Sequence, residues 1–278
     1  MTRLFVALLL AAAAVIGYPA AQAGKGVPAL DHVVVLVFEN KDEQQVIGAR
    51  AAPTFNAMAR RYVRFTQYHG VSHPSLPNYI AMVSGSTQGI TNDCTTCIVD
   101  APNLADSLEQ AGRTWKTYAE GLPQPGFTGA LADLYAKKHD PFVYFRDIAS
   151  SPGRRKRVVP FTQLRVDLRE NTLPDFALIV PDMCNSMHDC SVRTGDRWLA
   201  RVLPPLLKLR NTLVFVTFDE GNAGNHIPTA ALGTAVRRGT RITTPTNHYS
   251  LLRTIEQAWG LPLLGRSAAA KPITAIWP

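Results

Sequence analysis

The chain has 278 residues, 46% of them hydrophobic, and its 29 Lys and Arg residues exceed its 21 Asp and Glu residues by 8. This composition provides for a sizeable core, and the sequence shows no internal repeat, low-complexity segment or interdomain linker. The positive charge favours anionic substrates, but the basic residues are scattered along the chain, which argues against a specific nucleic-acid site.

The first 23 residues have the pattern of a cleavable secretory signal peptide. Arg3 precedes an apolar run at 4–16, and a small-residue triplet follows at 21–23. A membrane anchor is the alternative, but this run has 13 residues, whereas a spanning helix needs about 20. No later segment is long and apolar enough to span a membrane. We therefore expect a signal peptide at 1–23, a single domain at 24–278, and a protein that is secreted or retained in the periplasm or cell envelope.

The first half of the mature chain predicts a buried strand followed by helices. The run DHVVVLVF at 31–38 is apolar without alternation, which is typical of a parallel strand covered on both faces. The other expected elements are a helix at 53–62, a strand at 63–68, a helix at 75–83 with Pro77 in its first turn and Gly85 at its end, and a helix at 103–112 capped by Asn103.

The second half continues the alternation of strands and helices. Expected strands are 176–180 and 212–218, and expected helices are 196–209, broken or kinked at Pro204-Pro205, and 248–259. The stretch 123–157 is rich in Gly, Pro and charge and is expected to form long loops or a small insertion. The alternation predicts an α/β fold with a mostly parallel central sheet and helices on both faces.

Acidic residues follow each of the predicted buried strands. Glu39 follows the first, Asp182 the second, and the pair Asp219-Glu220 the third. The carboxyl ends of strands in an open α/β sheet share the edge where ligands bind, so these carboxylates would converge on one site. Turn or cap residues that merely end the strands are the alternative. Carboxylate oxygens suit divalent cations, which polarise a phosphoryl oxygen and lower the pKa of a bound hydroxyl.

A candidate nucleophile lies in the segment SHPSLPNY at 72–79. Ser75 stands at the start of a predicted helix, where free backbone amides and the positive end of the helix dipole favour a phosphate. A serine is a weak nucleophile that needs activation, which a neighbouring cation supplies. The alternative is that Ser75 caps the helix and does nothing more.

Three histidines lie near these residues in the sequence: His73, His188 and His248. A histidine can ligate a metal, bind phosphate or protonate a leaving oxygen. His188 is supported by its neighbour Asp189 and by the cysteines on either side, and His248 by its place at a helix start. The remaining histidines, His32, His69, His139 and His226, have no comparable support.

Four cysteines in an exported chain suggest two disulfides. Pairing of Cys94 with Cys97 and of Cys184 with Cys190 is the simplest of three connectivities. A redox Cys-x-x-Cys pair and a four-cysteine zinc site are the alternatives.

Six segments, in order along nearly the whole mature chain, match a known pattern: VVVLVFEN at 33–40, SHPSLPNYIAMVSG at 72–85, LPDFALIVPD at 173–182, MHDCSVRTGDRWL at 187–199, VFVTFDEGN at 214–222 and HYSLLRTIEQAWGLP at 248–262. Together they resemble the bacterial phosphoesterase family of acid phosphatases and phospholipase C-type enzymes, within the alkaline phosphatase-like superfamily.

The resemblance implies an alkaline phosphatase-like fold with Ser75 as nucleophile and Asn78 helping to hold the phosphoryl oxygens. It implies a metal held by Glu39, Asn40, Ser75, Asp219 and Glu220. His188 and His248, with Asp182 and Asp189, would complete the phosphate site or form a second metal site. Two-metal alkaline phosphatases have aspartate where Glu39 stands and histidine after the later aspartate. Because of this departure, we expect one divalent cation, of unknown identity, and a second is in doubt.

The sequence thus predicts a secreted, metal-dependent acid phosphatase that hydrolyses phosphomonoesters through a phosphoserine. Its expected substrate is a small anionic phosphate ester or a phospholipid, and its oligomeric state is open. The alternatives are a phospholipase C-like phosphodiesterase and a non-catalytic anion-binding protein on the same scaffold. A sulfatase is disfavoured because the residues after Ser75 lack the arginine of the sulfatase motif C/S-x-P-x-R.

Overall fold

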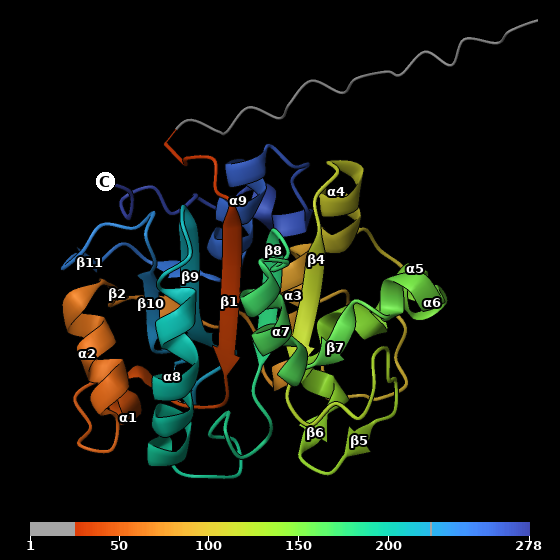
Figure 1. Cartoon of the computed structure of the whole chain (residues 1–278), viewed down its shortest axis with the longest axis horizontal. Helices are drawn as coiled ribbons and strands as arrows, with labels where there is room; N and C mark the ends of the chain where they lie inside the picture. The colour runs from red at the N-terminus through yellow and green to blue at the C-terminus, as the bar shows by residue number, and fades with distance from the viewer. Residues whose placement is uncertain (1–25, 223) are drawn as a thin grey trace, which may run out of the picture.

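The structure, a computed structural model, describes residues 26–222 and 224–278. Its centre is an eight-stranded sheet with the strand order β11-β2-β10-β9-β1-β8-β4-β7 (Figure 1). These strands are β1 (His32–Phe38), β2 (Val63–Phe65), β4 (Trp115–Ala119), β7 (Val158–Pro160), β8 (Phe176–Val180), β9 (Thr212–Phe218), β10 (Thr229–Leu232) and β11 (Arg241–Ile242). Strand β10 runs antiparallel to β9 and β2, and the other pairings in this sheet are parallel. The prediction of a mostly parallel α/β fold is confirmed.

Helices and two small sheets surround the central sheet. The helices are α1 (Glu43–Val46), α2 (Pro53–Arg61), α3 (Ser75–Ser84), α4 (Leu104–Gln110), α5 (Arg146–Ala149), α6 (Pro152–Arg155), α7 (Thr162–Glu170), α8 (Val192–Leu206) and α9 (His248–Trp259), with 3₁₀ turns at Lys137–His139, Pro141–Tyr144 and Gly265–Ala268. Strand β3 (Tyr68–His69) pairs with β12 (Thr246–Asn247), and β5 (Leu131–Ala132) pairs with β6 (Tyr135–Ala136). Helices α2, α7 and α8 lie on the face turned to the viewer in Figure 1, and α3 and α9 pack on the opposite face.

The apolar side chains of β1 pack against the helices on both faces of the sheet. Successive side chains of a strand point to opposite faces. Val35 lines a small cavity with residues of α3 and α9. Phe38 points the other way, its ring centroid 5.2 Å from that of Phe55 in α2 and 5.7 Å from that of Trp198 in α8. Because both faces of β1 are covered, alternation is absent from its sequence.

Several predicted boundaries differ from the structure. Helix α8 begins at Val192, stabilised by the Ser191 side chain, which accepts from the Thr194 backbone N–H. It continues through Pro204-Pro205 to Leu206, so the prolines lie near its end and do not interrupt it. The predicted strand 63–68 is divided between β2 and β3, which belong to different sheets. The stretch 123–157 forms the β5–β6 hairpin and short helical turns.

Both predicted disulfides are present, Cys94–Cys97 and Cys184–Cys190, so the alternative of a four-cysteine zinc site is wrong. In the part of the chain that the structure describes, no helix combines the length and apolar character that crossing a membrane requires. The predicted signal peptide at 1–23 lies outside the described residues.

Candidate active site

The carboxyl ends of β1 and β9 bring two of the predicted acids together. The strands are in register with Phe38 opposite Phe218, and the Asp219 backbone N–H donates to the Phe38 carbonyl at 3.0 Å. The residues that follow, Glu39 and Asp219, therefore leave the same edge of the sheet side by side. Both carboxylates are buried.

Helix α3 directs Ser75 at this pair. Ser75 is the first residue of the helix, and Pro74, not Ser75, occupies the cap position. Its hydroxyl is buried and lies 3.2 Å from Glu39 Oε2, 3.4 Å from Asn40 Oδ1 and 3.3 Å from Glu220 Oε1. The alternative that Ser75 only caps the helix is therefore wrong, because its side chain faces the cluster of Glu39, Asn40, Asp219 and Glu220, which we call the acidic cluster.

The cluster is rich in oxygen atoms and poor in donors. Asn40 adopts a left-handed backbone conformation (φ 50°), which asparagine tolerates better than most residues. Its side-chain amide lies 3.3 Å from Asp219 Oδ1 and 3.2 Å from Glu220 Oε1. Without a cation the amide nitrogen would face these oxygens and donate to both, whereas the amide oxygen would face them only with a cation in between. Asp219 Oδ2 is buried and has no hydrogen-bond partner among the described residues. A cation at this point would satisfy all of these oxygens at once.

The donor set also fits a hard divalent cation, because Glu39, Asn40, Ser75, Asp219 and Glu220 all offer oxygen. Within residues 26–222 and 224–278, no three His, Cys, Asp or Glu side chains form a metal-binding group by themselves. The five side chains named here include an amide and a hydroxyl, and oxygens of Glu39, Asn40 and Glu220 lie within 3.4 Å of the Ser75 hydroxyl.

The electrostatics of the cluster are those of acids crowded together away from water. Burial, followed by the charge of Asp219, raises the pKa of Glu39 well above its usual range. Burial, followed by the charge of Glu220, raises the pKa of Asp219 to about 7. Burial raises the pKa of Glu220 as well, and a hydrogen bond from His73 opposes the rise. Such a cluster favours a positive charge at its centre.

Two residues that the sequence did not single out, Tyr79 and His139, lie against the Glu39 carboxylate. The Tyr79 hydroxyl, one turn along α3 from Ser75, donates to Glu39 Oε1. His139 Nε2 lies 3.3 Å from Glu39 Oε2 without forming a hydrogen bond, and its ring stacks on Tyr79 with the centroids 5.4 Å apart. Burial lowers the pKa of His139 well below its usual value, which favours a neutral imidazole.

Lys138 and Asp93 extend the site beyond Glu39 and were also not predicted. Lys138 Nζ lies 2.9 Å from Asp93 Oδ2 and 3.3 Å from His188 Nε2. Asp93 Oδ1 accepts from the Leu76 backbone N–H at 2.9 Å, so a carboxylate occupies one of the helix amides that we expected to face phosphate. The predicted residue His188 thus lies beside a lysine at the margin of the cluster.

Asn78 and His248 are buried, and both bond to backbone groups beside the site. Asn78 Oδ1 accepts from the backbone N–H groups of Val71 and Ser72, and its Nδ2 donates to the carbonyls of Ser72 and Pro74. His248 Nε2 lies 2.6 Å from the Asp219 carbonyl oxygen, and burial lowers the pKa of His248 to about 4. In this arrangement both side chains position neighbouring backbone.

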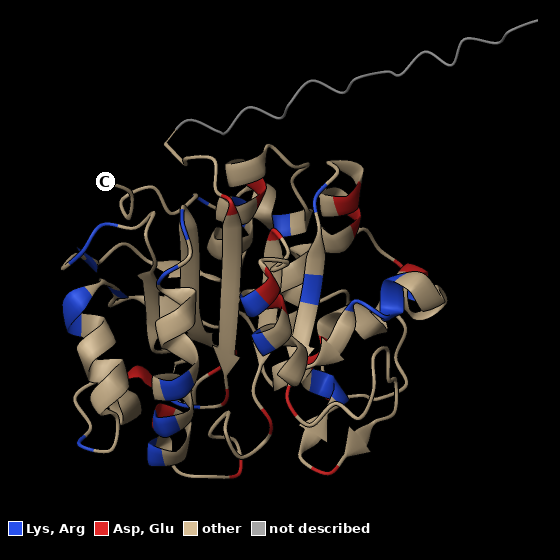
Figure 2. Ribbon diagram, in the orientation of Figure 1, with Lys and Arg blue, Asp and Glu red and all other residues tan. Residues whose placement is uncertain are grey.

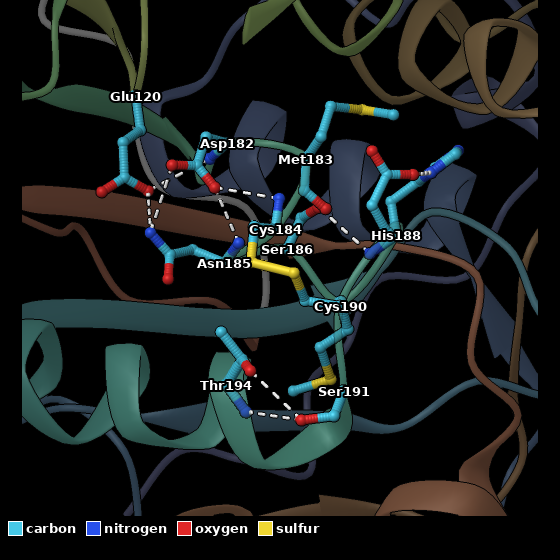
Figure 3. Close-up of a disulfide and its surroundings, with 12 residues drawn as sticks. Glu120, Asp182, Met183, Cys184, Asn185, Ser186, His188, Cys190, Ser191 and Thr194 are labelled. Carbon is cyan, nitrogen blue, oxygen red and sulfur yellow. Dashed lines mark hydrogen bonds and ion pairs between the residues drawn. A yellow bond between two sulfur atoms is a disulfide. The ribbon is translucent and has the colours of Figure 1, made fainter. Parts of the chain in front are cut away.

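Asp182 is directed into the disulfide loop and not into the cluster. Its Oδ1 accepts from the backbone N–H groups of Cys184 and Asn185 at 3.0 and 2.7 Å (Figure 3). The loop 184–190 in turn holds the end of β1. Ser186 O accepts from the Glu39 backbone N–H at 2.9 Å, and Met187 O accepts from Lys41 Nζ at 2.9 Å. Asp189, which the resemblance placed beside Asp182 in the site, accepts from His188 Nδ1 at 2.7 Å.

Comparisons with known structures place the fold. A protein of the alkaline phosphatase superfamily from Vibrio parahaemolyticus superposes with a TM-score of 0.59 at 16% identity, covering 92% of this chain and 72% of its own. The lipoteichoic acid synthase LtaP from Listeria monocytogenes superposes with a TM-score of 0.60 at 12% identity, covering 87% of this chain and 76% of its own. The fold is that of the alkaline phosphatase superfamily, with the acidic cluster and Ser75 at the carboxyl edge of its sheet.

Comparison with known sequences identifies the family within this superfamily. The chain belongs to the Phosphoesterase family, whose model matches residues 39–262, and it is a hydrolase of phosphoric esters. It is 38% identical to a phosphatidylinositol-3-phosphatase from Mycobacterium tuberculosis, over 92% of this chain and 85% of that protein. It is 32% identical to a phosphate-repressible acid phosphatase from Penicillium chrysogenum, over 86% of this chain and 61% of that protein. An acid phosphatase from Aspergillus fumigatus is 34% identical over 78% of this chain. The chain spans only 53% of that protein's length.

Proposed function

We propose that this protein is an exported, metal-dependent acid phosphatase that hydrolyses phosphomonoesters through a phosphoserine at Ser75. The observation that carries the proposal is the position of the Ser75 hydroxyl, within 3.4 Å of oxygens from Glu39, Asn40 and Glu220. The disulfides support an oxidising compartment outside the cytoplasm.

The cation would be held by Glu39, Asn40, Ser75, Asp219 and Glu220. When bound, it would lower the pKa of the Ser75 hydroxyl and polarise a phosphoryl oxygen. Ser75 Oγ attacks phosphorus, and the bond from phosphorus to the leaving alkoxide breaks. Water then attacks the phosphoserine on the side opposite Ser75 Oγ, which releases phosphate and restores the serine. His188 is the candidate donor to the leaving oxygen, because it lies at the more exposed margin of the site, whereas His248 is buried and bonded to the Asp219 carbonyl.

A phosphomonoester on a lipid headgroup belongs among the substrates to be tested, because the relative from Mycobacterium tuberculosis is named a phosphatidylinositol-3-phosphatase. Lys138, 3.3 Å from His188 and paired with Asp93, places an ammonium group that can also contact a phosphoryl oxygen at this margin of the site.

The test is turnover of a chromogenic phosphomonoester, its phosphocholine diester and phosphatidylinositol 3-phosphate, with and without chelator and added divalent metals. Ser75→Ala is expected to abolish hydrolysis, by at least about a thousandfold. Ser72→Ala is the matched control, since the one bond that the Ser72 hydroxyl makes among the described residues is to the His73 carbonyl. Full activity in Ser75→Ala would refute the nucleophile, activity that survives metal removal would refute the cation, and preference for the diester would make the protein a phosphodiesterase.

A further inference from the structure

A groove lies between α7 and α8, on the helical layer opposite α3. Its volume is about 960 Å³, within the range of about 300–1,000 Å³ that is usual for small-molecule sites. Its lining is mostly apolar and includes Phe161, Leu164, Leu168, Trp198, Val202 and Pro205. The rings of Phe161 and Trp198 form one wall, with their centroids 5.3 Å apart.

Arginines border this apolar surface. Arg165 and Arg169 of α7 and Arg201 of α8 line the groove. Figure 2 shows blue segments on both helices, on the face turned to the viewer. All three residues are exposed, and Arg169 pairs with Glu170. The side chains of Arg165 and Arg201 make no hydrogen bond, ion pair or ring contact with any residue that the structure describes, so their guanidinium groups are open to a ligand.

The spacing of the arginines also indicates that they do not serve to stabilise the two helices. Arg165 and Arg169 are four residues apart on α7, and Arg193, Arg197 and Arg201 are four residues apart on α8. Like charges at this spacing repel each other on one side of a helix and weaken it.

The one acid in the lining, Glu120, forms no ion pair with these arginines, because its oxygens accept hydrogen bonds from neutral groups on the side of the disulfide loop. Glu120 Oε1 accepts from Trp198 Nε1 at 3.1 Å. Glu120 Oε2 accepts from the Asp182 backbone N–H at 3.1 Å and from Asn185 Nδ2 at 3.0 Å (Figure 3). A ligand in the groove therefore meets an apolar floor and a positive border.

We propose that the groove between α7 and α8 binds a single-chain anionic amphiphile, with its hydrocarbon chain on the apolar floor and its anionic head at Arg165 and Arg201. Apolar area supplies affinity, and guanidinium groups select a carboxylate or phosphate head. This site is separate from Ser75, and its occupation requires no ester hydrolysis.

The test is calorimetric titration with laurate below its micellar concentration, since laurate has both features and no phosphoester bond. One laurate is expected to bind per chain. Butyrate, with the same head and a short chain, and dodecyltrimethylammonium, with the same chain and the opposite charge, are expected to bind at least about tenfold more weakly. Equal binding of the cationic amphiphile, or no binding of laurate, would overturn the proposal.

Two double variants with the same change in charge separate the groove from the general positive charge. Arg165→Ala with Arg201→Ala is expected to weaken laurate binding about tenfold. Arg193→Ala with Arg197→Ala removes two exposed arginines that do not line the groove, and its affinity is expected to stay within about twofold of the parent. Equal losses in the two variants would show non-specific attraction only.

A third variant blocks the floor, because Val166→Trp places a large side chain in the groove from a partly exposed position. It is expected to abolish laurate binding, and unchanged affinity would contradict the assignment. Thermal unfolding of each variant confirms folding without reference to catalysis. Laurate binding in a protein that hydrolyses no ester would leave this proposal standing while the proposed function fails.

Discussion

At the scale of single residues, the orientation of Glu39 depends on the tyrosine beside it. The Tyr79 hydroxyl donates to Glu39 Oε1, which leaves Oε2 directed at Ser75. Tyr79→Phe removes this contact, and we expect a loss of affinity for the divalent cation of about 10-fold or more, because partners of a ligand orient it. The measurement is turnover as a function of metal concentration.

Tyr135→Phe is the control for that loss. Tyr135 is also buried, but its hydroxyl lies 3.4 Å from Asp140 Oδ2 and makes no hydrogen bond to Glu39. If Tyr79→Phe and Tyr135→Phe require the same metal concentration as the parent, the hydroxyl of Tyr79 does not position a ligand.

A second prediction at this scale concerns Asn78, whose amide satisfies four backbone groups of the loop before α3. Asn78→Asp places a carboxylate oxygen against the carbonyls of Ser72 and Pro74, where the amide donates. We expect the free energy of unfolding to fall by about 3 kcal/mol, because a buried carboxylate then faces two carbonyl oxygens and both lose the hydrogen bond from Asn78. Denaturant unfolding measures the change.

Asn56→Asp is the matched control, because Asn56 also accepts from one backbone N–H, that of Gly48, and donates to one carbonyl, that of Ala49, but it is only partly buried. Its expected cost is about 1 kcal/mol. A stable Asn78→Asp variant with normal folding but altered phosphate affinity would instead support the sequence prediction that Asn78 contacts the substrate.

At the scale of elements, the disulfide loop 184–190 supports the end of β1. Ser186 O and Met187 O accept from the Glu39 backbone N–H and Lys41 Nζ. Cys184→Ala with Cys190→Ala frees this loop and is expected to lower stability by about 2 kcal/mol. We also expect kcat to fall about tenfold or more, because a displaced Glu39 costs the transition state more than the ground state.

The measurement is kcat at a temperature where circular dichroism shows the double variant to be folded. A variant that is less stable but has the kcat of the parent would limit the disulfide to a structural role.

Elements of the fold could be predicted where their signal is local. The runs of β1 and β9 and the cap of α4, where Asn103 accepts from the backbone N–H groups of Ala105 and Asp106, are visible in the sequence. Strand β4 was not predicted, because its apolar pattern is interrupted by Lys116. The structure shows why the charge is tolerated: Lys116 pairs with Asp167 of α7 at 2.5 Å, a contact that sequence cannot reveal.

In the candidate site, too, some residues could be predicted from local sequence and others could not. Glu39 and Asp219 follow strands with a clear pattern, and the structure brings them together with Ser75 and Glu220. His139 comes from a 3₁₀ turn within the stretch expected to be loops, and neither its spacing nor its neighbours indicate that it packs on Tyr79. The tertiary fold alone brings such a residue to the site, so no local pattern in the sequence indicates it.

At the scale of the whole molecule, the C-terminal segment gives the fold a pH dependence that is separate from catalysis. Glu256 of α9 is buried and accepts from the Leu264 backbone N–H at 2.9 Å and the Ser267 hydroxyl at 2.6 Å. Burial raises the pKa of Glu256 to about 7 from 4.5. Because the fold favours the protonated acid, the unfolded chain releases its proton at a lower pH than the folded chain does.

The stability that Glu256 contributes is therefore complete below about pH 4.5 and is lost as the pH rises through about 7. Glu256→Gln retains an acceptor and cannot titrate, so we expect the free energy of unfolding of the parent, relative to that of this variant, to decline across this interval and to level off above it. Denaturant unfolding of both proteins between pH 4 and pH 8 measures the difference. A constant difference would show that folding does not shift the pKa of Glu256. The expected decline would make an acidic compartment the environment in which the packing of the C-terminal segment on α9 is most stable.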